Sequence, residues 1–182
     1  MKEYLDFIRS AKESGDFEGY IEKHLPEYTG DLNDFWFHLS VEPLTTDFLA
    51  AHKDDVVWRC VCKYSILPEW FMDDYSDYMD WLSVSERQNF GMEFTVKHKY
   101  DLDWKVLIMR FKYPQDLLLE LIDDPEIQLD IGCVLQNQVL TRDQVERLSK
   151  VYAEKEIDRI RTERTTKVKY ASNACEAMAM DA

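Results

Sequence analysis

Apolar residues recur at helical spacing through much of the chain, in a pattern that repeats every 23 residues. Three segments, at 44–64, 67–87 and 90–110, each open on an apolar residue, with a Phe four residues later and a Trp fourteen residues later. An aliphatic residue follows each Trp by three positions. Residues three or four apart lie on one face of a helix, so the pattern predicts helices with a repeated apolar stripe. The tryptophans that mark the repeat are Trp58, Trp81 and Trp104.

Each copy of the repeat predicts two short helices. The first helices are expected at about 46–53, 68–76, 91–99 and 114–123, and the second helices at about 56–64, 79–87, 102–111 and 128–136. The fourth copy is degenerate, because Ile131 replaces the Trp and about four residues are added. Partial copies lie upstream, around Trp36, and downstream, from about residue 140.

One pair of ten-residue helices cannot bury a Trp and a Phe alone, whereas stacked neighbours build a continuous core. We therefore predict an all-α fold of tandem helix pairs that forms a small solenoid or a compact helical bundle. The predicted segments are N-terminal capping helices with a partial repeat at 1–43, helical repeats at 44–136, a long C-terminal helix at 137–166 and a frayed tail at 167–182. Gly15 is expected to stop the first helix.

Local signals place further residues on these helices. Thr141 is expected to cap the C-terminal helix, whose buried stripe would be Val145, Leu148, Val151 and Tyr152. Trp70, Phe71 and Trp81 are expected in the core. Acids near the start of a helix satisfy free N–H groups and complement the helix dipole. Six acids are predicted in such places: Asp55, Asp77, Asp80, Asp101, Asp103 and Asp130.

The charge is strongly acidic and unevenly distributed. The net charge is −14; residues 1–149 hold 15 basic and 30 acidic side chains, and residues 150–170 hold seven basic and four acidic ones. An acidic body repels phosphate backbones and attracts basic surfaces. The alternative is that the acidity only keeps the protein soluble.

Two stretches, 69–81 and 116–130, contain acids but no Lys, Arg or His. Either stretch is an acidic surface for a basic partner or a solvated helix face with acidic caps. The candidate partner-binding residues are Glu69, Asp73, Asp74, Asp77, Asp123, Asp124 and Glu126. A basic cluster in the C-terminal helix is a candidate nucleic-acid contact, or a solvated face balanced by neighbouring glutamates; it comprises Lys155, Arg159, Arg161 and Arg164.

Metal binding and catalysis find little support in the residue pattern. The histidines share no chelating spacing, and His52 and His98 are expected to be partly buried helix residues. Cys60 and Cys62 point to different sides of a helix, so they make a poor chelate and are expected to pack in the core. No nucleophile elbow, phosphate-binding loop or zinc-protease motif is present. We expect no enzyme activity, no metal and no cofactor.

The N-terminal residues lack the apolar run of a signal peptide, and no stretch approaches eighteen apolar residues. A cytoplasmic protein with reduced thiols is therefore expected.

The unit L-x-x-x-F-…-D-x-x-D-W-x-x-[VL] over residues 44–136 resembles short tandem helical repeats of proteins from phages, large DNA viruses and mobile elements of gut bacteria. In size and charge the chain also resembles anti-CRISPR proteins, in particular those that inhibit Cas9. This resemblance implies an inhibitor that binds a basic effector nuclease in the bacterial cytoplasm and blocks DNA binding or cleavage.

Two other functions stay open. One is a scaffold that binds a helix or peptide, with Tyr75, Tyr78 and Tyr100 as contacts if they are exposed. The other is a protein that touches DNA through its basic C-terminal helix.

Overall fold

The computed structural model describes residues 3–127, 129–154, 156–157 and 161–162. Within these residues all regular structure is helical and there is no strand, which confirms the predicted all-α class. The described residues form two compact units, which divide between Leu107 and Ile108. The division into 1–43, 44–136, 137–166 and 167–182 follows the sequence pattern rather than compactness and stays a prediction.

The first unit begins with three helices and a short 3-10 turn, α1 (Glu3–Glu13), α2 (Phe17–His24), η1 (Leu25–Glu27) and α3 (Leu32–Leu39). It continues with α4 (Thr46–Ala51), α5 (Trp58–Tyr64), α6 (Glu69–Asp74), η2 (Ser76–Tyr78), α7 (Trp81–Arg87) and α8 (Met92–Lys97). The boundary between the units falls inside α9 (Trp104–Arg110). The second unit contains α10 (Gln115–Asp123), α11 (Ile131–Asn137) and a helix at 142–154.

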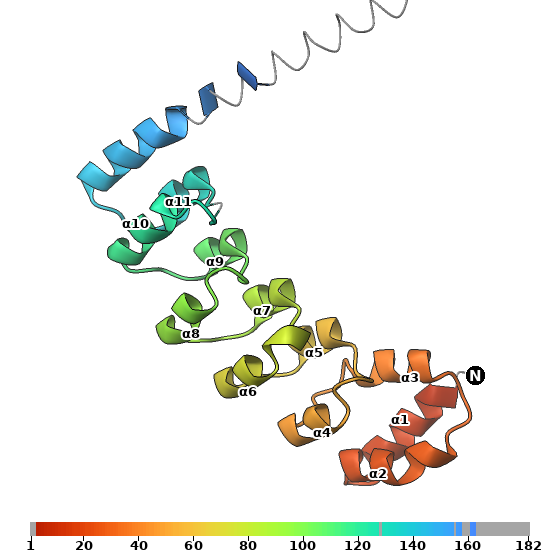
Figure 1. Ribbon diagram of the computed structural model, residues 1–182. Helices are drawn as coiled ribbons and strands as arrows, with labels where there is room; N and C mark the ends of the chain where they lie inside the picture. Colours follow the sequence, from red (N-terminus) through yellow and green to blue (C-terminus); the bar gives the residue numbers. More distant parts are fainter. Residues whose placement is uncertain (1–2, 128, 155, 158–160, 163–182) are drawn as a thin grey trace, which may run out of the picture. The chain divides into compact units, whose positions relative to one another are not determined.

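Helix starts follow the 23-residue period of the sequence. The first helices α4, α6 and α8 begin at residues 46, 69 and 92, and the second helices α5, α7 and α9 begin at 58, 81 and 104. Within the first unit, α4, α6 and α8 form one row and α3, α5 and α7 form another, as Figure 1 shows. We call these the first-helix row and the second-helix row.

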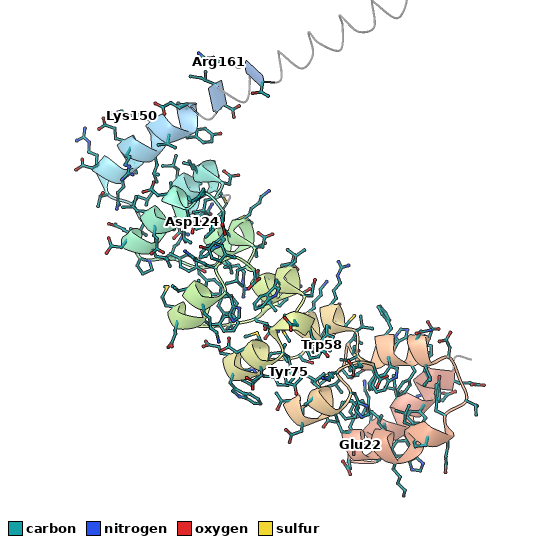
Figure 2. The ribbon with its side chains drawn as sticks, viewed as in Figure 1. Glu22, Trp58, Tyr75, Asp124, Lys150 and Arg161 are labelled. Atoms are coloured by element: carbon teal, nitrogen blue, oxygen red, sulfur yellow. The ribbon has the colours of Figure 1, made fainter. Side chains whose placement is uncertain are left out.

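Tryptophans hold the two rows together. The tryptophans of α3, α5 and α7 lie against aromatic rings of the next first helix and of its C-cap residue, with ring centroids 4.7–6.5 Å apart. Trp58 and Tyr75, both labelled in Figure 2, form one of these stacked pairs. Aromatic pairs at such distances add to the free energy gained by burying their surface. The contacts are Trp36 with Phe48 and His52, Trp58 with Phe71 and Tyr75, and Trp81 with Phe94 and His98.

A buried glutamine joins successive repeats in each unit. Gln88 follows α7; its amide accepts from the Leu67 N–H at 3.0 Å and donates to the carbonyls of Cys62 and Ser65 at 2.7 Å. Gln138 follows α11 and repeats the arrangement in the second unit, with the backbone of Ile108, Phe111 and Tyr113. Buried backbone groups in a connection need partners, and these two side chains supply them.

Several predicted caps are confirmed. Asp80 and Asp130 accept the N–H groups of Ser83 and Cys133, and Asp103 accepts that of Val106. Thr141 Oγ1 accepts from the Gln144 N–H at 3.3 Å, while the Gln144 side chain accepts from the Thr141 N–H at 2.9 Å. This reciprocal pair is a capping box. Gly15 follows α1 with φ +79°, a conformation that favours glycine.

Other packing predictions are wrong. Trp70 is not in the core: its side chain is 56% exposed, because α6 turns Phe71 and Met72 inward instead. In the C-terminal helix only Leu148 of the predicted stripe is fully buried, and Val145 and Tyr152 are exposed. Asp77 caps no helix, since α7 begins at Trp81 with Asp80 as its cap.

Candidate functional site

Two of the predicted partner-binding acids serve the contact between α6 and α8. Glu69 Oε1 accepts a hydrogen bond of 2.5 Å from the N–H of Gly91, the residue before α8. Asp73 Oδ1 lies 2.6 Å from His98 Nε2 and 2.9 Å from Lys97 Nζ. The stretch 69–81 lacks bases in sequence, but the next repeat brings two of them to Asp73.

The Asp73–His98 pair is partly sheltered from water. His98 is buried against the rings of Trp81 and Phe94, at centroid distances of 4.7 and 4.5 Å. Its ring donates to the Asp73 carboxylate, and this hydrogen bond, followed by the contact with Lys97, lowers the pKa of Asp73. The expectation that His52 and His98 are at least partly buried is confirmed.

The other two acids of the first stretch face solvent. Asp74 ends α6 and Asp77 lies in η2, and both side chains are exposed. Within the part of the chain that the structure describes, neither carboxylate forms a hydrogen bond or an ion pair. Asp74 and Asp77 are therefore the members of this stretch that a partner could contact without disturbing the fold.

The second acidic stretch belongs to the second unit. Asp123 Oδ2 lies 3.4 Å from Arg147 NH2, in a solvent-exposed ion pair. Asp124 accepts the N–H of Glu126 at 3.0 Å and so shapes the turn after α10. Glu126 itself is exposed. Here too a basic residue from a later helix compensates a stretch that lacks bases in sequence.

The predicted nucleic-acid contact lies almost entirely outside the described residues. Lys155, Arg159 and Arg164 belong to that undescribed part. Arg161 is described, helical and exposed (Figure 2).

The charge of the first unit is divided between its two rows, a feature that the sequence analysis missed. The first-helix row with the turns after its helices, at 46–56, 69–79 and 92–102, holds nine acidic and three basic side chains. Its negative charge lies at 46–56 and 69–79, since 92–102 holds two acids and two bases. The second-helix row, at 32–39, 58–64 and 81–87, holds three basic and two acidic side chains. The repeat contains this difference in charge, but the difference is visible only when the charges of the first helices and of the second helices are counted separately. The bases of the second-helix row are Arg59, Lys63 and Arg87.

We define the acidic face as the exposed carboxylates of α4, α6 and the turns after them. Equivalent repeat positions lie on the same side of a row, so the acids after α4 and α6 recur along one edge. Among the described residues, His52 Nδ1 lies 3.7 Å from Asp55 Oδ2. Lys53 lies 5.4 Å from the ring of Tyr78, and its contact with that hydroxyl raises the pKa of Lys53. The members of the acidic face are Asp47, Asp54, Asp55, Glu69, Asp74 and Asp77.

The described residues contain no group of three or more His, Cys, Asp and Glu side chains that could hold a metal ion. Cys60 and Cys62 are buried, as predicted, and burial raises the pKa of Cys62 to about 11. A thiol with such a pKa stays protonated near neutral pH and is a poor nucleophile. No helix in the described part of the chain is long and apolar enough to cross a membrane.

Comparisons with known proteins provide no relative from which to transfer a function: no family model matches the chain, and no curated protein or solved structure is significantly similar to it.

Proposed function

We propose that this protein is a non-enzymatic inhibitor that binds a basic, nucleic-acid-binding protein through its acidic face. The observation that carries the proposal is the division of charge in the first unit. Acids that served only solubility would need no such separation between the two rows. An acidic row beside a row with several bases instead gives the unit an electrostatically distinct side, which can steer and orient a basic partner.

The specific partner that we propose is a Cas9-type nuclease in the bacterial cytoplasm. Such nucleases hold guide and target in positively charged channels, and these would accept an ordered row of carboxylates. The support comes from the acidic face together with the sequence resemblance to anti-CRISPR proteins. Bound there, the carboxylates would occupy phosphate positions and compete with DNA.

A cleavage assay tests the proposal. Purified protein is titrated into Cas9 with guide RNA, and cleavage of a target duplex is followed. We expect cleavage to fall with added wild-type protein and to be restored when Asp74→Lys and Asp77→Lys are combined. The matched control combines Glu13→Lys and Glu86→Lys, which changes the net charge equally at exposed sites outside the acidic face. Equal inhibition by both double variants would refute the acidic face as the contact.

A second function is favoured by exposed apolar side chains on the same row. Trp70 of α6 and Met92 and Val96 of α8 are all exposed. Large exposed aromatics often anchor protein partners. A scaffold that binds a helix or peptide through these side chains would lose affinity on Trp70→Ala and respond little to salt, whereas the acidic face would respond strongly.

A further inference from the structure

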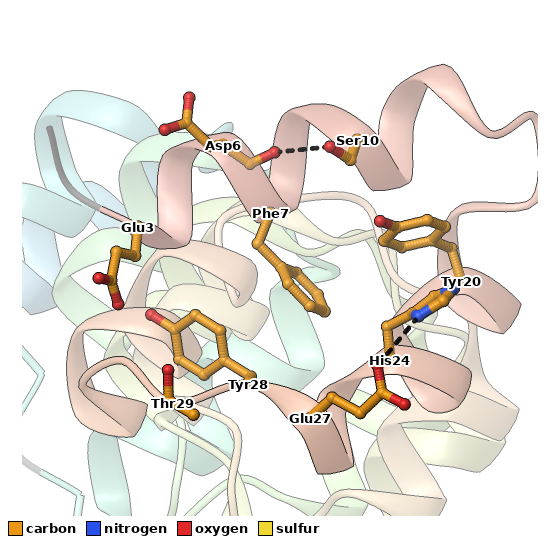
Figure 3. Close-up of a pocket in the computed structure, with 9 residues that line it drawn as sticks. All are labelled: Glu3, Asp6, Phe7, Ser10, Tyr20, His24, Glu27, Tyr28 and Thr29. Atoms are coloured by element: carbon orange, nitrogen blue, oxygen red, sulfur yellow. Dashed lines mark hydrogen bonds and ion pairs between the residues drawn. The ribbon is translucent and has the colours of Figure 1, made fainter.

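A cavity of about 410 Å³ lies among the N-terminal helices of the first unit, and neither the repeat nor the acidic face accounts for it. Figure 3 shows its wall and rim. Helix α1 supplies Glu3, Asp6, Phe7 and Ser10, while α2, η1 and the segment after them supply Tyr20, His24, Glu27, Tyr28 and Thr29. The lining combines aromatic rings with carboxylates and contains neither Lys nor Arg.

Three aromatic rings make the wall. Phe7 lies between Tyr20 and Tyr28 in Figure 3, with ring centroids 5.7 and 5.4 Å away and the planes steeply inclined. Phe7 also packs edge-on against Phe35, with ring centroids 5.4 Å apart. Tyr20 also lies against the His24 ring, at a centroid distance of 4.4 Å, and Phe7, Tyr20 and Tyr28 all line the cavity. Aromatic rings that line a cavity can hold an organic cation through cation–π attraction.

The charges around the wall are negative. Glu3 and Glu27 are exposed at the rim, and Asp6 is already paired with Arg9 at 3.1 Å. His24 Nδ1 lies 4.0 Å from a Glu27 oxygen. Burial, followed by the nearby carboxylates of Glu3, Asp31 and Asp34, raises the pKa of Tyr28. Each of these carboxylates would favour a positive group placed beside the Tyr28 ring.

We infer that this cavity binds the guanidinium group of an arginine side chain, presented by a peptide or protein segment. A guanidinium is planar and weakly hydrated, so it stacks on a ring while its N–H groups reach a carboxylate, here Glu3 or Glu27. The compact ammonium of lysine is more strongly hydrated and lacks the planar face. The inference shares no residue with the acidic face and does not depend on the proposed nuclease partner.

A titration of the full chain with a small probe tests the inference directly. N-acetyl-arginine methylamide is added to isotope-labelled protein, and amide and aromatic NMR signals are recorded. The neutral citrulline analogue has nearly the same shape and serves as the control ligand. We expect saturable shifts confined to residues 3–29 with the arginine probe, and binding at least roughly fivefold weaker with citrulline, since the charge is removed. Equal shifts with the two probes, or no shifts, would overturn the inference.

Variants at exposed sites test the rim without threatening the fold. Glu3→Gln combined with Glu27→Gln should weaken arginine binding roughly threefold or more, a size typical of losing exposed ion pairs. Glu13→Gln combined with Glu86→Gln removes the same charge elsewhere and should leave the affinity unchanged. If both double variants bind the arginine probe equally, the cavity is not the binding site.

Discussion

Asp73 shows how a single carboxylate joins two repeats. It lies on α6 but takes its partners, Lys97 and His98, from the end of α8 and its cap. Asp73 and Lys97 are 24 residues apart in sequence, and so are Asp123 and Arg147. Pairs separated by about one repeat length recur because the repeat places equivalent positions side by side.

We predict that Asp73→Asn lowers the free energy of unfolding by about 1–2 kcal/mol near neutral pH, because a charged acceptor of the His98 hydrogen bond is lost. Asp74→Asn removes the same charge from an exposed carboxylate and should change stability by less than about 0.5 kcal/mol. Urea denaturation of both variants measures the difference. Similar losses in the two variants would show that the Asp73 pair contributes nothing.

The same pair predicts a dependence on pH. The pKa of Asp73 is lowered in the folded state, so its stabilisation is complete above the unfolded pKa, about 3.9, and is lost as the pH falls through the folded value. The stability difference between wild type and Asp73→Asn should therefore hold from neutral pH to about pH 4 and shrink below it. A difference that grows on acidification below this point would contradict the assignment.

Trp70 is exposed, whereas Trp58 packs against other aromatic rings, so replacing the two residues should have different effects on stability. We predict that Trp70→Ala costs less than about 1 kcal/mol of unfolding free energy, because the side chain is 56% exposed. Trp58→Ala should cost about 2–4 kcal/mol, since Trp58 packs on Phe71 and Tyr75 and its indole N–H donates to the Lys53 carbonyl. Thermal and urea denaturation give both values. A loss of more than about 1 kcal/mol of unfolding free energy on Trp70→Ala would show that this side chain is packed in the core.

At the scale of elements, the connections between helices depend on a few side chains. Gln88 satisfies three backbone groups around the start of the second segment, at Leu67, and Ser40 and Ser85 Oγ accept the N–H groups of Val57 and Asp103. These bonds fix where one helix pair ends and the next begins, which is what keeps the 23-residue period in register.

We predict that Gln88→Leu costs about 2–4 kcal/mol, because it leaves buried N–H and C=O groups without partners. The neighbouring Asn89→Ala is the control, since Asn89 is exposed, and it should be close to neutral. Gln138→Leu should have a similar cost in the second unit. Denaturation midpoints in urea give the comparison, and a mild effect of Gln88→Leu would mean that water replaces the amide.

Helix starts were predictable from the sequence, because the Trp spacing and the acidic caps are local signals. The predicted starts of α4 to α9 lie within about two residues of the observed starts, which is the usual uncertainty of helix ends. The prediction that Trp70 lies in the core is wrong because Trp70 and Phe71 are adjacent aromatic residues, and the sequence pattern does not tell which of the two faces inward. The partners of Asp73 and the amide bonds of Gln88 were missed because they depend on side chains about one repeat away.

At the scale of the whole molecule, the acidic side chains are unevenly distributed. The first unit holds 22 acidic and 11 basic side chains, and the imbalance is concentrated on the N-terminal helices and the first-helix row. Charge separated in this way acts over about one Debye length, so its effect on association must weaken as salt is added. The salt response therefore reports whether the acidic face makes the contact.

The most direct test is the affinity of the full chain for Cas9 loaded with guide RNA, measured at about 0.1 M and about 0.5 M salt. The comparison uses wild type, Asp74→Lys with Asp77→Lys, and Glu13→Lys with Glu86→Lys. Our account predicts tight binding at low salt that weakens roughly tenfold or more at high salt, is lost in the acidic-face variant and persists in the control. Absent binding, or binding that neither salt nor the acidic-face variant weakens, would contradict it.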